Sequence, residues 1–172
     1  RTEKNLTFTG NILEGFEKLW ARGVDVELVI IGRMDSRSTR EPAILKRLKG
    51  ETRLKYLGHT SDAVIRDVMR QTRATLYISS MEGFGISPYE SLSAGVPVIV
   101  SQGLPSIELL PSGGRITLDT ISSTAVAAAV EAILDNRYAA QLWGEAARLA
   151  IPKWDDFVRN IAAWLHELPS DS

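Results

Sequence analysis

Residues 81–100 have the sequence MEGFGISPYESLSAGVPVIV, in which a glycine-containing loop leads into a well-signalled helix start. Ser87, Pro88 and Glu90 have the order of an N-cap, a first helical residue and a third helical residue, so we expect a helix to begin at Pro88. Its free N–H groups and the positive end of its dipole then point toward residues 83–86, where glycines let the backbone approach phosphate oxygens. The stretch therefore predicts a site for an anionic ligand.

The residues around this stretch alternate between short apolar runs and helix-like spacing, which is typical of βα units around a parallel sheet. Strands are expected over residues 26–31, 54–57, 74–79, 97–101 and 115–118. Helices are expected over residues 6–20, after Pro42, after residues 60–62, from Pro88, and over residues 107–110, 123–134, 137–150 and 154–168. We predict an α/β fold with a Rossmann-like, doubly wound parallel sheet. A strand should precede the first helix of such a sheet, so we expect the chain to lack its first strand.

The composition narrows the classes of function. The chain has 172 residues, enough for one domain with a sizeable core. Its 20 Lys and Arg nearly balance its 21 Asp and Glu, which gives no reason to expect nucleic-acid binding. No segment approaches the ~20 apolar residues that cross a bilayer, so no transmembrane segment is expected. Cysteine is absent and the two histidines are far apart, so we expect no metal site.

Glu82 and Glu90 form an E-x7-E pattern and flank the loop as acceptors for ligand hydroxyl groups. A capping box alone would explain Glu90, but it does not require Gly83 and Gly85 with a second glutamate before them. The order of residues resembles the donor-site segment of the retaining GT-B glycosyltransferases of the group 1, or family 4, type. The resemblance extends over about residues 4–165 and corresponds to the C-terminal, nucleotide-sugar-binding domain of that family.

The resemblance implies roles for the residues of the loop. Glu82 would face the donor sugar and the reacting carbon as a catalytic residue, and Glu90 would accept hydrogen bonds from the ribose hydroxyls. The backbone that would lie against the sugar and diphosphate belongs to Gly83, Phe84, Gly85 and Ile86.

Other residues match the family outside this loop. Lys4 resembles the lysine that neutralises the departing diphosphate, although an exposed lysine at a helix start is the alternative. Gly32 resembles the glycine of the family across which the nucleotide lies. A simple turn after a strand would explain a glycine at this position equally well. Gly58 and His59 follow the end of a predicted strand. By resemblance, they correspond to the position at which proteins of this family contact the nucleobase, mainly through backbone atoms.

The resemblance implies transfer of a hexosyl group from a GDP- or UDP-linked sugar to a saccharide or a lipid-linked saccharide in polysaccharide biosynthesis, without a cofactor or metal. Residues 1–172 would form one donor-binding domain. The acceptor-binding N-terminal domain of the family has no counterpart here, so the isolated chain is expected to be inactive. We expect a cytoplasmic location, with any peripheral membrane contact made by that missing domain.

Two alternatives remain open. The chain could be a non-catalytic module that binds a nucleotide sugar or a protein partner. It could also belong to an epimerase or phosphorylase that shares the GT-B architecture, although the E-x7-E spacing argues against this second alternative.

Overall fold

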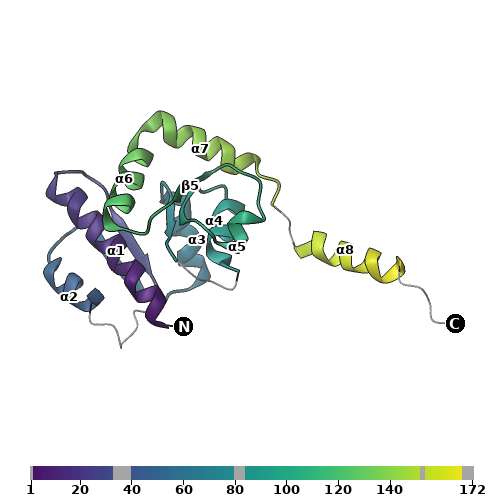
Figure 1. Ribbon diagram of the computed structural model, residues 1–172, viewed down its shortest axis with the longest axis horizontal. Helices are drawn as coiled ribbons and strands as arrows, with labels where there is room; N and C mark the ends of the chain where they lie inside the picture. Colours follow the sequence, from purple (N-terminus) through teal and green to yellow (C-terminus); the bar gives the residue numbers. More distant parts are fainter. Residues whose placement is uncertain (1, 33–39, 80–83, 152–153, 168–172) are drawn as a thin grey trace.

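The computed structural model describes residues 2–32, 40–79, 84–151 and 154–167 and shows alternating strands and helices (Figure 1). The strands are β1 (Leu28–Ile31), β2 (Leu54–Gly58), β3 (Thr75–Tyr77), β4 (Val98–Ser101) and β5 (Arg115–Leu118). The helices are α1 (Thr2–Ala21), α2 (Arg40–Arg47), α3 (Asp62–Gln71), α4 (Ile86–Ser93), α5 (Pro105–Glu108), α6 (Ser123–Leu134), α7 (Asn136–Arg148) and α8 (Trp154–Glu167). This order confirms the predicted α/β class.

The described strands form two parallel sheets. One has the order β1-β2 and the other the order β3-β4-β5, and β1 does not pair with β3. The prediction of parallel, βα-connected strands is confirmed, but a single sheet through all of them is not observed in this part of the chain. Because β1 and β3 each pair with a described strand on one side only, each of them keeps one open edge.

Helices cover both faces of the three-stranded sheet. On one face, Ile99 of β4 packs in a cluster with Leu13 of α1 and Val126 of α6. On the other face, Val98 and Val100 pack with residues of α4, α5 and α7. All four residues of β4 are therefore buried, as expected for a central parallel strand that is covered on both sides.

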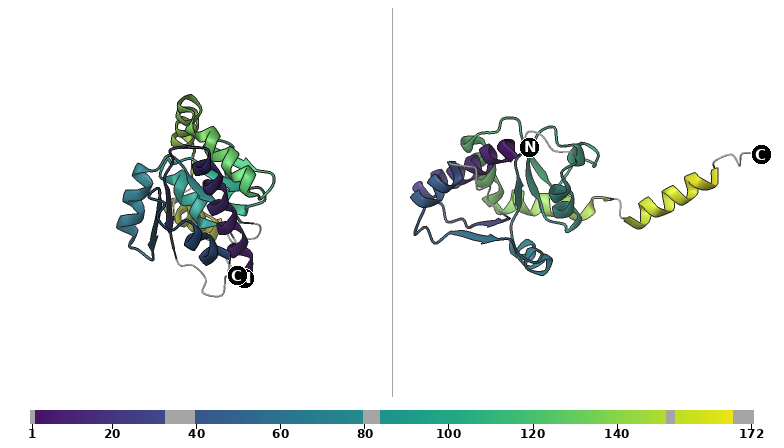
Figure 2. Two further views of the ribbon diagram at one scale, coloured as in Figure 1. Left: turned by 90° about the vertical axis from the view of Figure 1, so that its left-hand side faces the viewer. Right: turned by 90° about the horizontal axis from the view of Figure 1, so that it is seen from below.

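The helix α8 lies apart from these layers. It projects away from the rest of the chain in Figure 1 and in the right-hand view of Figure 2. Its apolar residues Val158, Ile161 and Trp164 are exposed. No described helix is long and apolar enough to span a bilayer.

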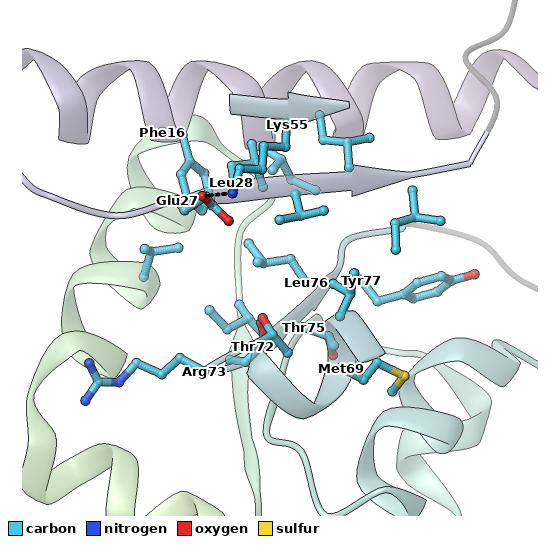
Figure 3. A pocket seen from close by; sticks show the side chains of 18 of the residues that line it. Phe16, Glu27, Leu28, Lys55, Met69, Thr72, Arg73, Thr75, Leu76 and Tyr77 are labelled. Atoms are coloured by element: carbon cyan, nitrogen blue, oxygen red, sulfur yellow. Dashed lines mark hydrogen bonds and ion pairs between the residues drawn. The ribbon is translucent and has the colours of Figure 1, made fainter. Parts of the chain in front are cut away.

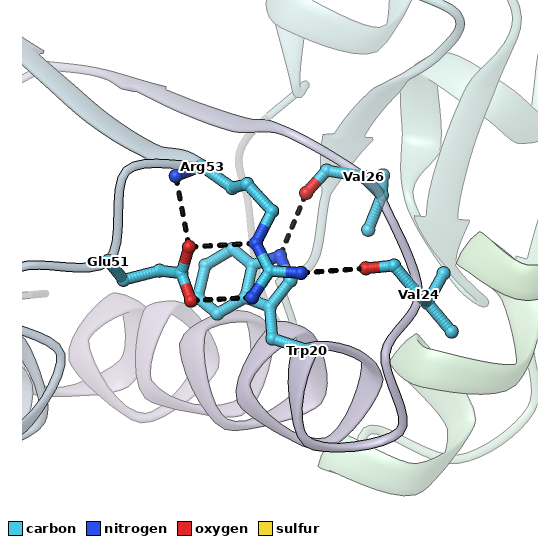
Figure 4. Close-up of polar contacts among 5 residues, drawn as sticks. All are labelled: Trp20, Val24, Val26, Glu51 and Arg53. Atoms are coloured by element: carbon cyan, nitrogen blue, oxygen red, sulfur yellow. Dashed lines mark hydrogen bonds and ion pairs between the residues drawn. The ribbon is translucent and has the colours of Figure 1, made fainter.

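The start of β1 is set by side chains from neighbouring elements (Figure 4). The Trp20 indole N–H donates to the Val26 carbonyl at 2.8 Å, and the Arg53 guanidinium donates to the Val24 carbonyl at 3.1 Å. The predicted strand over residues 26–31 begins only at Leu28, since the Val26 carbonyl is already engaged by the Trp20 side chain. Arg53 also lies over the Trp20 ring, 5.5 Å from its centroid.

Glu51 completes this cluster. Its carboxylate accepts from the Nε and Nη2 atoms of Arg53, each at 2.7 Å, and from the Arg53 backbone N–H at 3.0 Å. The side-chain hydrogen bonds of Arg53, followed by the backbone one, lower the pKa of Glu51 from 4.5 to about 2. The ionised form of Glu51 is thus favoured in the folded chain.

We expect this pair to make stability depend on pH at the acid end. A carboxyl group with a lowered pKa contributes stability above its unfolded pKa, here 4.5, and that contribution is lost as pH falls through about 2. The difference in unfolding free energy between the parent chain and Glu51→Gln should therefore shrink as the pH falls from 4.5 toward about 2, as measured by urea unfolding. Glu131→Gln is the matched control, because the Glu131–Arg22 pair is half exposed on both sides. A difference that stays constant through this range would contradict the role of the pair.

Candidate functional site

A cavity of about 1070 Å³ lies between β1 and β3 and reaches the ends of these strands (Figure 3). Its lining at the carboxyl ends of the strands includes Gly32 after β1, Ser79 after β3, and Ser87 and Glu90 of α4. Ligands of open α/β sheets bind outside the carboxyl ends of the strands. This end of the cavity is therefore the candidate site.

The helix α4 begins earlier than predicted. It starts at Ile86, with Gly85 as its N-cap in a left-handed conformation (φ 84°) and without a side-chain capping hydrogen bond. The prediction of an N-cap at Ser87 and a first helical residue at Pro88 is wrong. The left-handed turn at Gly85 starts the helix two residues sooner, and Pro88 still falls within the first turn, where its missing N–H costs no hydrogen bond.

This shift changes the interpretation of Glu90. Glu90 is the fifth residue of α4, so the capping box predicted for it is wrong. Its side chain is exposed and makes no hydrogen bond or ion pair with any residue that the structure describes. Helix formation does not account for this carboxylate, which lines the same cavity as Gly32.

Phe84, just before α4, is tied to a distant part of the chain through its backbone. The Ser106 N–H donates to the Phe84 carbonyl at 3.0 Å, and the Phe84 ring lies 6.1 Å from the Tyr89 ring. Burial, and to a smaller extent the charge of Asp156, raises the pKa of Tyr89. Phe84 and Ile86 are exposed at 42% and 62%, so both remain accessible beside the helix start.

Gly32 and Gly58 lie side by side at the carboxyl ends of β1 and β2. The Gly32 N–H donates to the Gly58 carbonyl at 2.8 Å, and the Tyr56 hydroxyl donates to the Gly32 carbonyl at 3.0 Å. Both glycines have positive φ, 122° and 62°, which favours glycine at each position. His59 follows directly and is exposed.

The structure thus brings together some predicted residues and leaves others apart. Gly32 and Glu90 share the cavity, and Gly58 with His59 adjoins Gly32. Phe84, Gly85 and Ile86 are placed at the start of α4 and do not line this cavity. Outside the described part of the chain lie Glu82, Gly83 and the side chain of Lys4.

Three serines at or near this site were not predicted from the sequence. Ser79 and Ser87 line the carboxyl end of the cavity. Ser106, bonded through its backbone to the loop before α4, has a buried hydroxyl with no hydrogen-bond partner among the described residues. Spacing could have suggested Ser79, since it ends a predicted strand, but nothing in the sequence distinguishes Ser106.

Within the described ranges, no group of three or more His, Cys, Asp or Glu side chains is placed to hold a metal ion. Among the residues that the structure describes, the polar groups of the site are backbone N–H groups, hydroxyls and the Glu90 carboxylate. Such a set can donate to phosphate oxygens and accept from sugar hydroxyls.

The chain belongs to the family of group 1 glycosyl transferases, whose model matches residues 2–150. Among its relatives, the serotype-specific mannosyltransferase WbdA of Escherichia coli is 28% identical over 92 residues, which cover 51% of this chain and 11% of the relative. A phosphatidyl-myo-inositol mannosyltransferase of Mycolicibacterium smegmatis is 38% identical over 93 residues, which cover 52% of this chain and 22% of the relative. The chain therefore spans a small part of the length of these relatives.

Solved structures confirm the architecture. Anabaena Alr3699/HepE in complex with UDP-glucose matches with a TM-score of 0.72 and 18% identity, over 92% of this chain and 44% of that one. Sucrose-phosphate synthase from Thermosynechococcus elongatus matches with a TM-score of 0.70 and 17% identity, over 90% of this chain and 41% of that one. At these identities the likeness shows the fold, an α/β domain of GT-B type.

Proposed function

We propose that this chain is the nucleotide-sugar-binding domain of a retaining glycosyltransferase of the family 4 type. The whole enzyme would transfer a hexosyl group from a GDP- or UDP-linked sugar to a hydroxyl of a saccharide or lipid-linked saccharide. An acceptor-binding N-terminal domain of the same protein would supply the other half of the active site. The observation that carries the proposal is the Glu90 carboxylate, which has no partner among the described residues and lines one cavity with Gly32 at the carboxyl ends of the strands.

The relatives support this class of substrate. The two relatives described above are named mannosyltransferases, and the Anabaena structure contains UDP-glucose. The exposed carboxylate of Glu90 has the chemistry to accept hydrogen bonds from ribose hydroxyls. The N–H groups at the start of α4 have the chemistry to donate to a diphosphate.

The proposed reaction proceeds by charge stabilisation. The bond between the anomeric carbon and the phosphate oxygen breaks, and its electron pair stays with the nucleoside diphosphate. Lys4 and the N–H groups of α4 stabilise this developing charge, while Glu82 faces the reacting carbon. The acceptor hydroxyl forms the new bond from the same face and gives its proton to the departing diphosphate. The reaction needs no cofactor and no metal.

Replacing Glu90 with alanine should weaken UDP binding by about tenfold, or ~1.4 kcal/mol, because hydrogen bonds from the ribose hydroxyls to a charged acceptor are lost. Isothermal titration calorimetry of the chain with UDP, and in parallel with GDP, measures this change and shows which base is preferred. Since Glu90 does not belong to the cap of α4, the free energy of unfolding should change by less than ~0.5 kcal/mol.

Glu131→Ala is the matched control, since Glu131 is a half-exposed glutamate that pairs with Arg22 and does not line the cavity. It should leave nucleotide affinity unchanged. Equal affinity of the parent chain and Glu90→Ala for both nucleotides would contradict the ribose role. In the whole protein, unchanged sugar transfer after Glu82→Gln would favour the non-catalytic alternative.

A further inference from the structure

The hydroxyl of Ser101 holds the chain where it leaves β3. This hydroxyl accepts a hydrogen bond from the Ser79 N–H at 3.0 Å and donates one to the Ser79 carbonyl. The register of β3 against β4 ends with Tyr77 opposite Val100, two residues before Ser79. Beyond the end of β3, one side chain therefore engages both backbone groups of Ser79 in place of the sheet.

This contact is shielded from solvent. Ser101 is 1% exposed and Ser79 is 3% exposed. Buried backbone N–H and C=O groups are almost always hydrogen-bonded, and leaving one without a partner is costly. Removal of the Ser101 hydroxyl takes a partner from two such groups at once, so the chain after β3 has to shift to regain hydrogen bonds.

The Ser101 hydroxyl acts on the site only through Ser79. Its single proton is committed to the Ser79 carbonyl, and its oxygen already accepts from the Ser79 N–H. Because the side chain is buried, it does not reach a ligand bound outside the ends of the strands. Ser101 can therefore position other residues but does not take part in chemistry itself.

A second contact from the same part of the chain holds the residues before α4. The Ser106 N–H donates to the Phe84 carbonyl at 3.0 Å, next to the left-handed turn at Gly85. Residues 101 and 106 thus engage residues 79 and 84, one on each side of Glu82 in the sequence. The two contacts bracket the first glutamate of the E-x7-E pattern.

The segment that makes both contacts is itself well anchored. The Gln102 N–H donates to the Leu118 carbonyl of β5 at 3.1 Å. Leu104 is 1% exposed within the apolar cluster of β4, α4, α5 and α7, and Ser106 is completely buried. Residues 101–106 therefore provide a fixed base for Ser79 and for the residues before α4.

We propose that Ser101 is a positioning residue of the donor site, and that its bonds to Ser79 set the alignment of the protein against the sugar of a nucleotide diphosphate sugar. This inference rests on the proposed function and adds a residue to it. The chain leaves β3 through Ser79 and continues toward Glu82, the residue proposed to face the reacting carbon. A small displacement of such a group from its productive position can lower a rate by about two orders of magnitude.

The proposal separates the sugar from the nucleoside. Glu90 belongs to α4 and Gly32 follows β1, so neither depends on the bonds that Ser101 makes. The Gly32 N–H is held by the Gly58 carbonyl at 2.8 Å. Loss of the Ser101 hydroxyl should therefore weaken the contacts of the sugar and leave those of the nucleoside in place.

Titration calorimetry of the 172-residue chain tests this separation. The probes are UDP with UDP-glucose and GDP with GDP-mannose. Ser101→Ala should weaken binding of the preferred sugar nucleotide by about tenfold. It should weaken binding of the matching nucleoside diphosphate by less than about twofold, because ribose and diphosphate contacts are retained.

A pair of variants of equal shape isolates the hydroxyl. Ser101→Thr keeps the hydroxyl, whereas Ser101→Val has nearly the same shape without it. Threonine should restore the affinity for the sugar nucleotide and valine should not. In the whole protein, kcat for sugar transfer should fall on the order of a hundredfold with alanine or valine and recover with threonine.

Ser91→Ala is the matched control for loss of a buried hydroxyl. Ser91 is completely buried, its hydroxyl donates to the Val96 carbonyl at 3.0 Å, and it lies 2.7 Å from the Thr75 hydroxyl. These contacts join α4 to β3 and do not involve Ser79 or Phe84. The control should lower stability, as Ser101→Ala also does, but should leave the ratio of the two affinities and kcat unchanged.

Three outcomes would overturn the positioning role of Ser101. They are an equal effect of Ser101→Ala on both kinds of ligand, equal behaviour of the threonine and valine variants, and a selective loss of sugar-nucleotide affinity in Ser91→Ala. In each case the loss of nucleotide affinity expected for Glu90→Ala can still be observed, so the proposed function would stand. A parent chain that binds none of the four probes would overturn the proposed function and this inference with it.

Discussion

Truncation of Leu13 to alanine is expected to lower the free energy of unfolding by about 3–4 kcal/mol. Leu13 is fully buried in α1, at 0% exposure, within the cluster that joins α1 to α6 and the sheet. The two helices are already in close contact, since a Cβ atom at Gly15 would lie 3.0 Å from the Ser123 carbonyl oxygen and from a Val126 methyl group. The neighbours of Leu13 therefore have little room to collapse into the space that truncation leaves.

Urea unfolding followed by circular dichroism measures this loss. Leu109→Ala is the matched control, because the same atoms are removed from a side chain that is 75% exposed. That variant should change the free energy of unfolding by less than ~0.5 kcal/mol. Similar losses in both variants would show that α1 does not pack as described.

Substitution of Gly114 by alanine is expected to cost about 3 kcal/mol, the sum of backbone strain and overpacking. Gly114 has a φ of +63°, a conformation that residues with a Cβ atom rarely adopt. The new Cβ atom would lie 2.7 Å from the Cβ and 2.8 Å from the Cα of Ala146. Because Ala146 is held in α7, relief of the contact requires movement of the whole helix.

Gly95→Ala isolates the strain from the contact. Gly95 has a similar φ of +74°, but an added Cβ atom meets nothing within 4 Å. Its cost should be limited to about 1 kcal/mol of backbone strain. Equal destabilisation by the two alanines, measured by thermal or urea unfolding, would contradict the tight approach of α7 to Gly114.

Much of the fold could be predicted from local patterns. The apolar run at residues 97–101 predicted a strand covered on both faces, and β4 has all four of its residues buried. The predicted helix over residues 123–134 matches α6 at both ends. Spacing predicts such elements because burial on both faces of a strand, or along one stripe of a helix, dictates which residues recur.

The start of α4 could not be predicted in the same way. The order Ser87, Pro88 and Glu90 satisfies a capping box, but the chain enters the helix through a left-handed turn at Gly85. The Phe84 carbonyl just before this turn accepts a hydrogen bond from Ser106, a residue far along the chain. A local pattern does not contain that contact, so it misplaced the first residue of the helix.

Local patterns of residues were enough to specify most of the succession of strands and helices and the family, because each of these depends on a turn, a pleat or a short motif. Only the packing of distant segments showed that Glu90 lies beyond the cap of α4 and lines a cavity together with Gly32. The same packing showed that a cavity separates β1 from β3. Both outcomes depend on contacts between residues far apart in the chain, and the free energy of those contacts arises only when whole elements pack together.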